Sequence, residues 1–359
     1  MTKKFIKRYH YILYMGLSYI VLDYYIQNIN QGKNDILTAD SSPSFFTLAW
    51  LLFFIVLHLL LKGKIKKITY LCITIFFQIM FVVNAIYYEI FNMFFSFKTF
   101  GLASEAKEYF SVIFDYISFP LLASLGVSII LSILAFRFIP KDRHKTDLVL
   151  ALFFLIASIS FYYLARCDLG KLAPTNAWNT WAYKRNVYNS YSDTKKSLEV
   201  SGYYEYIVRD IYLSKIEDLF SNNDEQIEFL NNYFKLDQNT DYDENFNGIF
   251  KDKNLIIVLM ESIDSWLVTE DVMPTVTKLM KTGINFSNHF SPVYGGGATF
   301  NSEFMVNTGY STAYNYNQNA YFFSRNNYDY SLPNLLKKEG YISNAFHMNS
   351  GEYYSRGTN

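Results

Sequence analysis

The sequence predicts an α-helical, polytopic membrane domain followed by an α/β domain outside the membrane. Charged residues are sparse before about residue 164 and frequent after it, so the zero net charge averages two different halves. Long apolar stretches fill the first half, and short apolar runs alternate with helical patterns near the end. No long basic run offers nucleic acid an electrostatic footprint. We therefore divide the chain into a membrane domain (1–164), a helical linker (165–253) and an outer domain (254–359).

Five stretches approach the length of roughly 17–25 apolar residues that a membrane-spanning helix requires. The first is the weakest, because it is rich in tyrosine and carries Asp23 near its end. We expect it to be retained rather than cleaved as a signal peptide, since four further spans follow. The five predicted spans are Tyr9–Ile26, Phe45–Leu61, Ile68–Tyr88, Tyr116–Phe136 and Leu148–Leu164.

Basic residues in the short loops predict the orientation of these spans. One basic segment precedes the first span, one separates the second from the third, and one separates the fourth from the fifth. Because they alternate with loops that are poorer in basic residues, all three are expected in the cytoplasm, and everything after Leu164 outside. The segments contain Lys3, Lys4, Lys7 and Arg8; Lys62, Lys64, Lys66 and Lys67; and Arg137, Lys141, Arg143 and Lys145.

Individual polar residues of this region leave alternatives open. Asn84 and Glu89, near the outer end of the third span, either line a groove for a lipid or make interhelical hydrogen bonds beside an aromatic belt. The two cysteines do not form a disulfide framework. Cys72 falls in an apolar stretch and is expected to be buried, and a bond to Cys167 is not expected.

The linker is rich in Asn, Asp, Tyr, Lys and Ser. Apolar residues at helical spacing predict helices over Tyr204–Phe220 and Asp224–Phe234, which we expect to form a stalk between membrane and outer domain. Aromatic residues just past the fifth span suit an anchor at the level of the lipid headgroups: Trp178, Trp181 and Tyr183.

The outer domain alternates short apolar runs with helical patterns, which predicts a parallel α/β sheet. Predicted strands are Leu255–Met260, Asn285–Phe290 and Tyr341–His347, and predicted helices are Pro274–Lys281 and Leu332–Glu339. Such sheets bind ligands at the carboxyl ends of their strands. Glu261 and His347 each stand at the end of an apolar run, so both are expected at that edge.

A glycine-rich turn, Gly295–Gly297, precedes Thr299 at the start of a helix predicted to run through Phe304. The glycines let backbone approach a ligand, and the helix N-terminus favours an anion. Metal coordination is one way to activate a threonine hydroxyl as a nucleophile, and Glu261 is the nearest hard oxygen donor. Taken singly, Glu261 also suits a surface acid, Thr299 a helix cap and His347 a structural histidine.

Together, the spans, the linker, Met-Glu261-Ser and Gly-Gly-Ala-Thr299-Phe-Asn-Ser-Glu-Phe resemble the lipoteichoic acid synthase family of polyglycerolphosphate synthases. The resemblance covers the whole chain and implies an extracellular sulfatase-like domain of the alkaline-phosphatase type. It implies that Glu261 and Thr299 bind a divalent metal, manganese or alternatively magnesium, and that Thr299 attacks the phosphorus of phosphatidylglycerol. Diacylglycerol would leave, and a glycolipid or polyglycerolphosphate acceptor would then take the glycerophosphate from the threonine.

The segment from His347 to Arg356 resembles the family's phosphoglycerol-binding stretch. The resemblance implies that His347 and Arg356 hold the phosphate or glycerol, and a planar guanidinium suits phosphate oxygens. Asn349 stands where an aspartate is common in the family, and Tyr354 where a tryptophan is. These two substrate-binding positions leave the preference for headgroup and acceptor open.

Family members carry an Asp-His pair and further histidines beyond the point that corresponds to Asn359. We therefore expect a C-terminally truncated chain, inactive by itself, with an incompletely packed outer domain. Two other functions stay open: a related transferase that moves phosphoglycerol or phosphoethanolamine to another glycan, and a non-catalytic remnant that binds a lipid or a partner enzyme. The continuation Ser302-Glu303-Phe304 favours phosphoglycerol over phosphoethanolamine.

Overall fold

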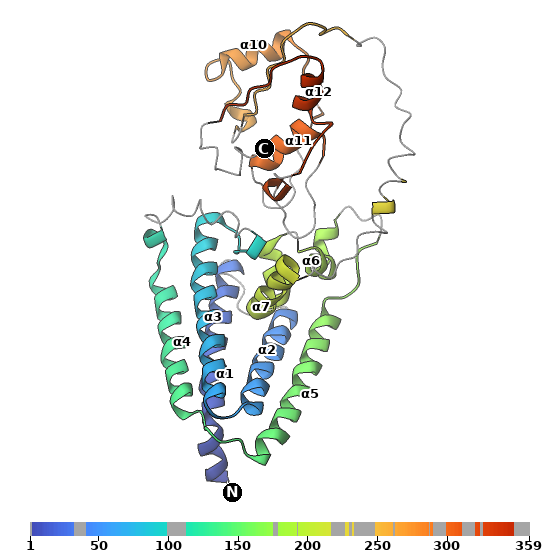
Figure 1. The fold of residues 1–359 in the computed structure, drawn as a ribbon. Helices are drawn as coiled ribbons and strands as arrows, with labels where there is room; N and C mark the ends of the chain where they lie inside the picture. Colours follow the sequence, from blue (N-terminus) through green and yellow to red (C-terminus); the bar gives the residue numbers. More distant parts are fainter. Residues whose placement is uncertain are drawn as a thin grey trace.

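The computed structural model shows a bundle of long helices and, after residue 248, a set of shorter helices and extended segments (Figure 1). The structure describes residues 2–31, 41–98, 113–174, 179–191, 193–216, 227–229, 232, 248–260, 263–286, 288–289, 299–310, 320–323 and 326–347.

The bundle contains α1 (Thr2–Gln31), α2 (Ser41–Leu60), α3 (Gly63–Phe91), α4 (Phe119–Phe138) and α5 (Lys145–Asp168). Each overlaps one of the five predicted spans. α2 packs chiefly along α5, and α1 along α4. The start of α4 follows from local chemistry, because the Ser118 hydroxyl accepts a hydrogen bond from the Leu121 N–H at 3.4 Å and Pro120 occupies the first turn.

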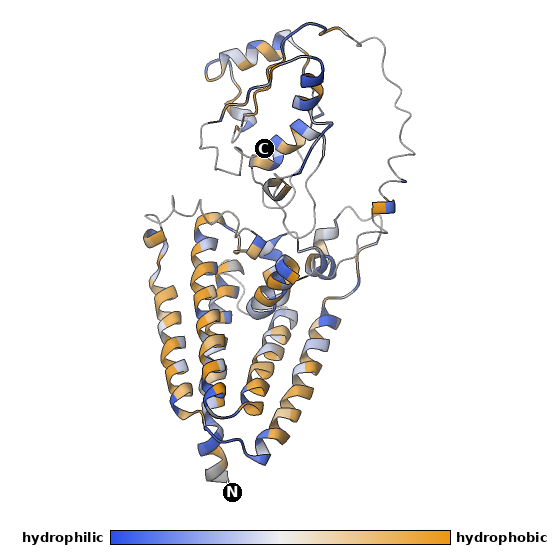
Figure 2. Cartoon of the chain, viewed as in Figure 1, coloured by the Kyte–Doolittle hydropathy of each residue, from blue (hydrophilic) through white to orange (hydrophobic). Residues whose placement is uncertain are grey.

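Four helices of the described chain, α2, α3, α4 and α5, are long and apolar enough to cross a membrane. The prediction of five apolar spans is wrong in this respect, since α1 does not reach that hydropathy. Several of its polar residues pair inside the bundle instead of facing lipid: Arg8, Tyr9, Tyr19 and Asp23. The outer faces of α4 and α5 expose apolar side chains, as a bilayer requires (Figure 2); Ile130 and Phe153 are 61% and 63% exposed.

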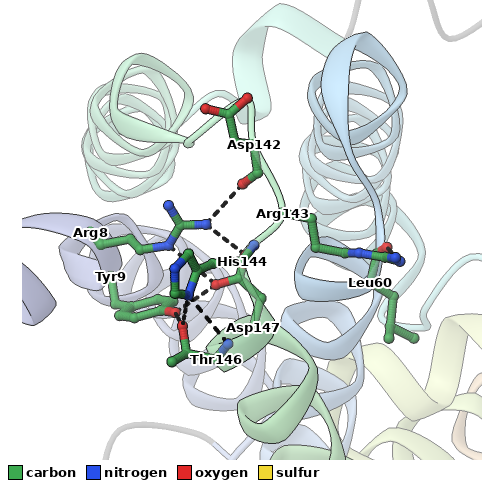
Figure 3. Close-up of polar contacts among 8 residues, drawn as sticks. All are labelled: Arg8, Tyr9, Leu60, Asp142, Arg143, His144, Thr146 and Asp147. Carbon is green, nitrogen blue, oxygen red and sulfur yellow. Dashed lines mark hydrogen bonds and ion pairs between the residues drawn. The ribbon is translucent and has the colours of Figure 1, made fainter.

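The three basic segments meet at one end of the bundle, which we call the basic end (Figure 3). Arg8 Nη2 of α1 donates to the Asp142 carbonyl at 2.9 Å, and the Gly63 N–H at the start of α3 donates to the Lys141 carbonyl at 2.9 Å. Arg143 Nη1 donates to the Leu60 carbonyl at the end of α2 at 3.2 Å. The arrangement gathers these segments at one end of the bundle, and their place relative to the membrane stays a prediction.

At the opposite end of the bundle, α6 (Lys184–Ser190) is followed by α7 (Thr194–Ile211) and a π-helical turn (Tyr212–Ile216). α7 packs against α2 and α1, so this part of the linker does not form the expected stalk. Its fully buried tyrosines donate to backbone carbonyls of the bundle and of the segment after α3: Tyr203 to Phe77 at 2.5 Å, Tyr204 to Tyr19 at 2.8 Å and Tyr206 to Phe95 at 2.9 Å.

A kink at Gly202 fits α7 against the bundle. The backbone there has φ 72° and ψ 172°, which glycine adopts readily and other residues do not. The Tyr203 N–H that follows donates to Asp23 Oδ1 of α1 at 2.9 Å, and the Thr47 hydroxyl of α2 donates to Asp23 Oδ2 at 3.0 Å. Asp23 therefore acts on the second half of α7 as a helix cap supplied by another helix.

Three expectations for single residues can now be compared with the structure. Cys72 is exposed on α3, so the prediction that it is buried is wrong, because its helix face points away from the bundle core. Both Cys72 and Cys167 are free thiols, which confirms that no disulfide joins them. Asn84 is buried, and its Nδ2 donates to the Met80 carbonyl of its own helix at 2.9 Å rather than across helices.

The outer part contains α10 (Pro274–Thr282), α11 (Thr299–Thr308) and α12 (Leu332–Lys338), with short 3₁₀ turns at Ser265–Leu267 and Ala320–Phe323. The three helices were predicted from sequence and are confirmed. α10 begins with proline in its first turn and ends at Gly283, and Ser331 is the N-cap residue of α12. In the second predicted linker helix the described residues 227–229 and 232 are helical, and its remaining residues lie outside the described ranges.

No β-strand is found among the described residues, so the strands predicted over Leu255–Met260 and Tyr341–His347 are wrong for this structure. Residues 287 and 290 of the run Asn285–Phe290 lie outside the described ranges. The Tyr341 hydroxyl donates to the Lys253 carbonyl at 3.1 Å, but no ladder of backbone hydrogen bonds joins the two described runs. Side chains of the first run are 44% to 84% exposed, where a strand of a covered parallel sheet would be buried.

Candidate active site

The described part of the candidate active site centres on α11. Phe300 and Asn301 in its first turn are 6% and 5% exposed, and Asn301 Oδ1 accepts a hydrogen bond from the Ala320 N–H at 2.7 Å. One turn later, the Phe304 ring packs edge-on to Tyr328 with centroids 5.3 Å apart. These contacts hold the N-terminal half of α11, and with it the backbone of Thr299, against the 3₁₀ turn at Ala320–Phe323 and the segment before α12.

His347 lies beside the same helix. Its Nε2 is 4.0 Å from Glu303 Oε1, close enough for an ion pair when the imidazole is protonated but too long for a hydrogen bond. Glu303 follows Thr299 by four residues, which places both on one face of α11. The structure thus brings His347, predicted from the end of a distant apolar run, to the helix that begins at the predicted nucleophile.

Glu303 was part of the recognised motif, but no role was predicted for it. The signal that would have singled it out is the four-residue spacing from Thr299, which puts a carboxylate one helical turn behind a threonine at a helix start. In the structure it lies beside His347.

The other predicted site residues lie outside the described residues: Glu261, Asn349, Tyr354 and Arg356. For Thr299 the structure describes the backbone at the start of α11 and not the side chain. The pairing of Glu261 with Thr299 therefore stays a prediction. Within the described ranges no three His, Cys, Asp or Glu side chains gather as a metal site. The predicted donors are a carboxylate and a hydroxyl, oxygen ligands that suit manganese or magnesium.

The chain matches two family profiles. The lipoteichoic acid synthase N-terminal domain matches residues 2–218, a range that contains the bundle, α6 and α7. The sulfatase profile matches residues 253–359, which contain α10, α11, α12 and all the predicted site residues.

Two proteins of Bacillus subtilis (strain 168) are similar to this chain. Lipoteichoic acid synthase-like YvgJ is 24% identical over 307 residues, which cover 83% of this chain and 47% of the relative. Lipoteichoic acid synthase 2 is 24% identical over 327 residues, which cover 85% of this chain and 46% of the relative. The chain thus spans about half the length of the curated relatives it matches. No solved structure matches it.

Proposed function

Because this chain belongs to the lipoteichoic acid synthase family, we propose that it serves the transfer of glycerophosphate from phosphatidylglycerol to a glycolipid or polyglycerolphosphate acceptor in lipoteichoic acid synthesis. Its sulfatase-like domain belongs to a class of transferases and hydrolases that generally depend on a metal. Its apolar helices and its family make it a multi-pass membrane protein.

One observation carries the proposal for the site: His347 Nε2 lies 4.0 Å from Glu303 Oε1, on the helix that begins at Thr299. An anionic phosphodiester at that helix N-terminus would meet the backbone N–H groups of the first turn and the positive end of the helix dipole. A protonated His347, held by Glu303, would add a positive charge on the same side. Asn349, Tyr354 and Arg356 follow His347 in the chain, and we propose that they bind the phosphoglycerol headgroup.

In the proposed reaction the Thr299 hydroxyl oxygen forms a bond to phosphorus. The bond from phosphorus to the diacylglycerol oxygen breaks, and diacylglycerol leaves with the proton. An acceptor hydroxyl then attacks the same phosphorus and releases the threonine, which regains a proton. We propose that Glu261 and Thr299 hold a manganese or magnesium ion, whose charge, when bound, favours the deprotonated hydroxyl.

The proposed topology places the basic end in the cytoplasm and the chain after Leu164 outside. It requires α1, although less apolar than the four candidate spans, to run through the bundle from the basic end to the α7 end. Two contacts support this path, since Arg8 of α1 pairs with Asp147 at the basic end and Asp23 accepts the Tyr203 N–H at the α7 end. A reporter fused after Leu164 is expected to be active outside the cell, and activity only in the cytoplasm would overturn the topology.

The test of the chemistry is Thr299→Ala in the full-length product of the gene that carries this sequence, reconstituted with phosphatidylglycerol. Release of diacylglycerol is expected to fall by more than about 1,000-fold. Thr308→Ala is the matched control, because it removes a threonine hydroxyl from the far end of α11. That hydroxyl donates to the Phe304 carbonyl at 2.7 Å and accepts from the Tyr310 N–H at 3.1 Å, and activity is expected to persist without it.

A second readout is independent of turnover. Intact-mass spectrometry after brief exposure to phosphatidylglycerol is expected to detect a glycerophosphate adduct on Thr299, which EDTA treatment or Thr299→Ala abolishes. Wild-type turnover by Thr299→Ala would exclude the threonine as nucleophile. Consumption of phosphatidylethanolamine in place of phosphatidylglycerol would point to the related phosphoethanolamine transferases, and lipid binding without turnover would point to a non-catalytic role.

A further inference from the structure

A second group of polar side chains lies within the bundle, near its basic end. Tyr11 of α1, His58 of α2 and Lys66 of α3 are each 0% exposed. Among the described residues, the Lys66 ammonium and the Tyr11 hydroxyl have no hydrogen-bond partner. The ring nitrogens of His58 make no hydrogen bond of good geometry, although the ring lies against the Lys66 backbone. Buried polar groups are nearly always paired, because removing them from water without a partner is costly. These orphaned donors therefore point to a ligand.

The three side chains form one cluster, although they come from three helices. Lys66 Nζ lies 5.5 Å from the centroid of the Tyr11 ring. Tyr70 follows Lys66 by one helical turn, and its ring meets that of His58 edge-on with centroids 5.3 Å apart. Lys66 and His58 are also close enough to interact electrostatically. The aromatic face of Tyr11 stabilises the ammonium in part, but it accepts no conventional hydrogen bond.

Asp147, the carboxylate that acts electrostatically on Lys66, is fully engaged elsewhere (Figure 3). Asp147 Oδ1 accepts from Arg8 Nε at 3.2 Å and from the Tyr9 hydroxyl at 2.5 Å. Asp147 Oδ2 accepts from Arg8 Nη2 at 2.7 Å and from the His144 N–H at 2.8 Å. A carboxylate offers about four acceptor positions, so none is left for Lys66. Asp147 thus pairs with Arg8, and among the described residues the ammonium of Lys66 has no hydrogen-bonded counterion.

We propose that this cluster binds one small monovalent inorganic anion of the halide class, such as chloride, between Lys66, Tyr11 and His58. The ammonium has three N–H donors, the phenol has one O–H, and a neutral imidazole has one N–H, so the site is rich in donors. A water molecule would satisfy donors but leave the charge uncompensated, whereas an anion does both. Lys66 is the fourth residue of α3, where the helix dipole adds further positive potential. The anion must be small, since all three side chains are shielded from solvent.

The test measures thermal unfolding of the full chain in detergent or nanodiscs, with sodium chloride exchanged for sodium gluconate at constant ionic strength. The midpoint of the wild type is expected to rise saturably, by about 2–3 °C at ten times the dissociation constant. Lys66→Met is expected to abolish this rise. The matched control is Lys67→Met, which removes the neighbouring ammonium, 4.5 Å from the Phe136 ring centroid, and is expected to keep it. An equal response in both variants, or no chloride response in the wild type, would overturn the proposal.

A second variant keeps the proposal testable if Lys66→Met does not fold. Tyr11→Phe retains the ring and removes one donor, so the chloride concentration for half-saturation is expected to rise by about 10-fold. Bromide provides a direct probe, because its anomalous diffraction identifies it in crystals. An anomalous peak within hydrogen-bond distance of Lys66 Nζ is expected, and ordinary water density there without an anomalous signal would refute the anion site.

Discussion

Replacing Gly202 by alanine tests the packing of α7 against α1 and α2, at the end of the bundle opposite the basic end. The backbone at Gly202 has φ 72° and ψ 172°, a region that only glycine populates freely. A Cβ atom placed there would lie 2.9 Å from the Pro43 carbonyl oxygen and 3.0 Å from Thr47 Oγ1. Thr47 cannot turn aside without loss, because its hydroxyl donates to Asp23. Either the backbone of α7 must change or α7 must move away from α2.

Both effects can be given a magnitude. Holding a non-glycine residue in this region costs roughly 1–3 kcal/mol. Inserting a methyl group against a backbone carbonyl costs a further 1–3 kcal/mol or so, as overpacking generally does. Gly202→Ala is therefore expected to lower the free energy of unfolding by roughly 2–5 kcal/mol, and to weaken the bond from the Tyr203 N–H to Asp23, which is 2.9 Å long.

The assay is equilibrium unfolding of the purified chain in detergent, followed by tryptophan fluorescence. Gly126→Ala is the matched control, because Gly126 lies in α4 without a positive φ and its added Cβ would meet nothing within 4 Å. This control is expected to gain up to about 1 kcal/mol from better helix propensity. If Gly202→Ala unfolds at the same denaturant concentration as Gly126→Ala, the kink is not under the constraint described and the reasoning fails.

Two further predictions concern buried charges. Arg8→Met leaves the carboxylate of Asp147, which is 0% exposed, without its cation, and is expected to lower the free energy of unfolding by about 3 kcal/mol. The double variant Arg8→Met, Asp147→Asn is expected to recover part of this loss. An unfolding free energy of Arg8→Met equal to that of the wild type would contradict the reasoning. Burial raises the pKa of Asp210 in α7 to about 6, so stability that is present below pH 4 is expected to fall as the pH rises through about 6, by roughly 3 kcal/mol in all. Asp210→Asn is expected to flatten that part of the profile of thermal midpoint against pH, and a profile equal to that of the wild type would refute the assignment.

The positions of the membrane helices could be predicted from sequence because each signal is local. Apolar runs fix where α2, α3, α4 and α5 lie, and residues such as Pro120 fix an end. α1 was predicted as a span from its position and length, yet it is less apolar than the candidate spans. It carries polar groups such as Arg8 and Asp23, which bond to other helices. Hydropathy cannot anticipate that Arg8 meets Asp147 or that Asp23 meets Tyr203, since the residues of each pair lie more than 130 positions apart.

In the outer part, the helices could be predicted from sequence but the strands could not. Its helices α10, α11 and α12 were predicted from proline, glycine and serine at their ends, which are local signals. The apolar run Leu255–Met260 was equally clear, but a parallel strand exists only when a neighbour completes its hydrogen bonds. Composition shows that a segment is able to form a strand, but it does not show whether a neighbouring strand is present to pair with it. For the site, the spacing of the motif located α11, and only the structure placed His347 next to Glu303.

Three buried carboxylates explain why α7 belongs to the bundle rather than to a stalk. Asp23 of α1 accepts the Tyr203 N–H, and Glu205 of α7 accepts from Trp50 Nε1 of α2 at 2.7 Å. Asp210 of α7 accepts from the Ser96 hydroxyl and the Phe97 N–H, in the segment after α3, at 2.6 and 2.7 Å. A solvated stalk would leave Glu205 and Asp210 in water, whereas a buried acid is tolerated only if it is bonded, as each of the three is here. The bonds therefore hold α7 at one orientation against α1, α2 and the segment after α3.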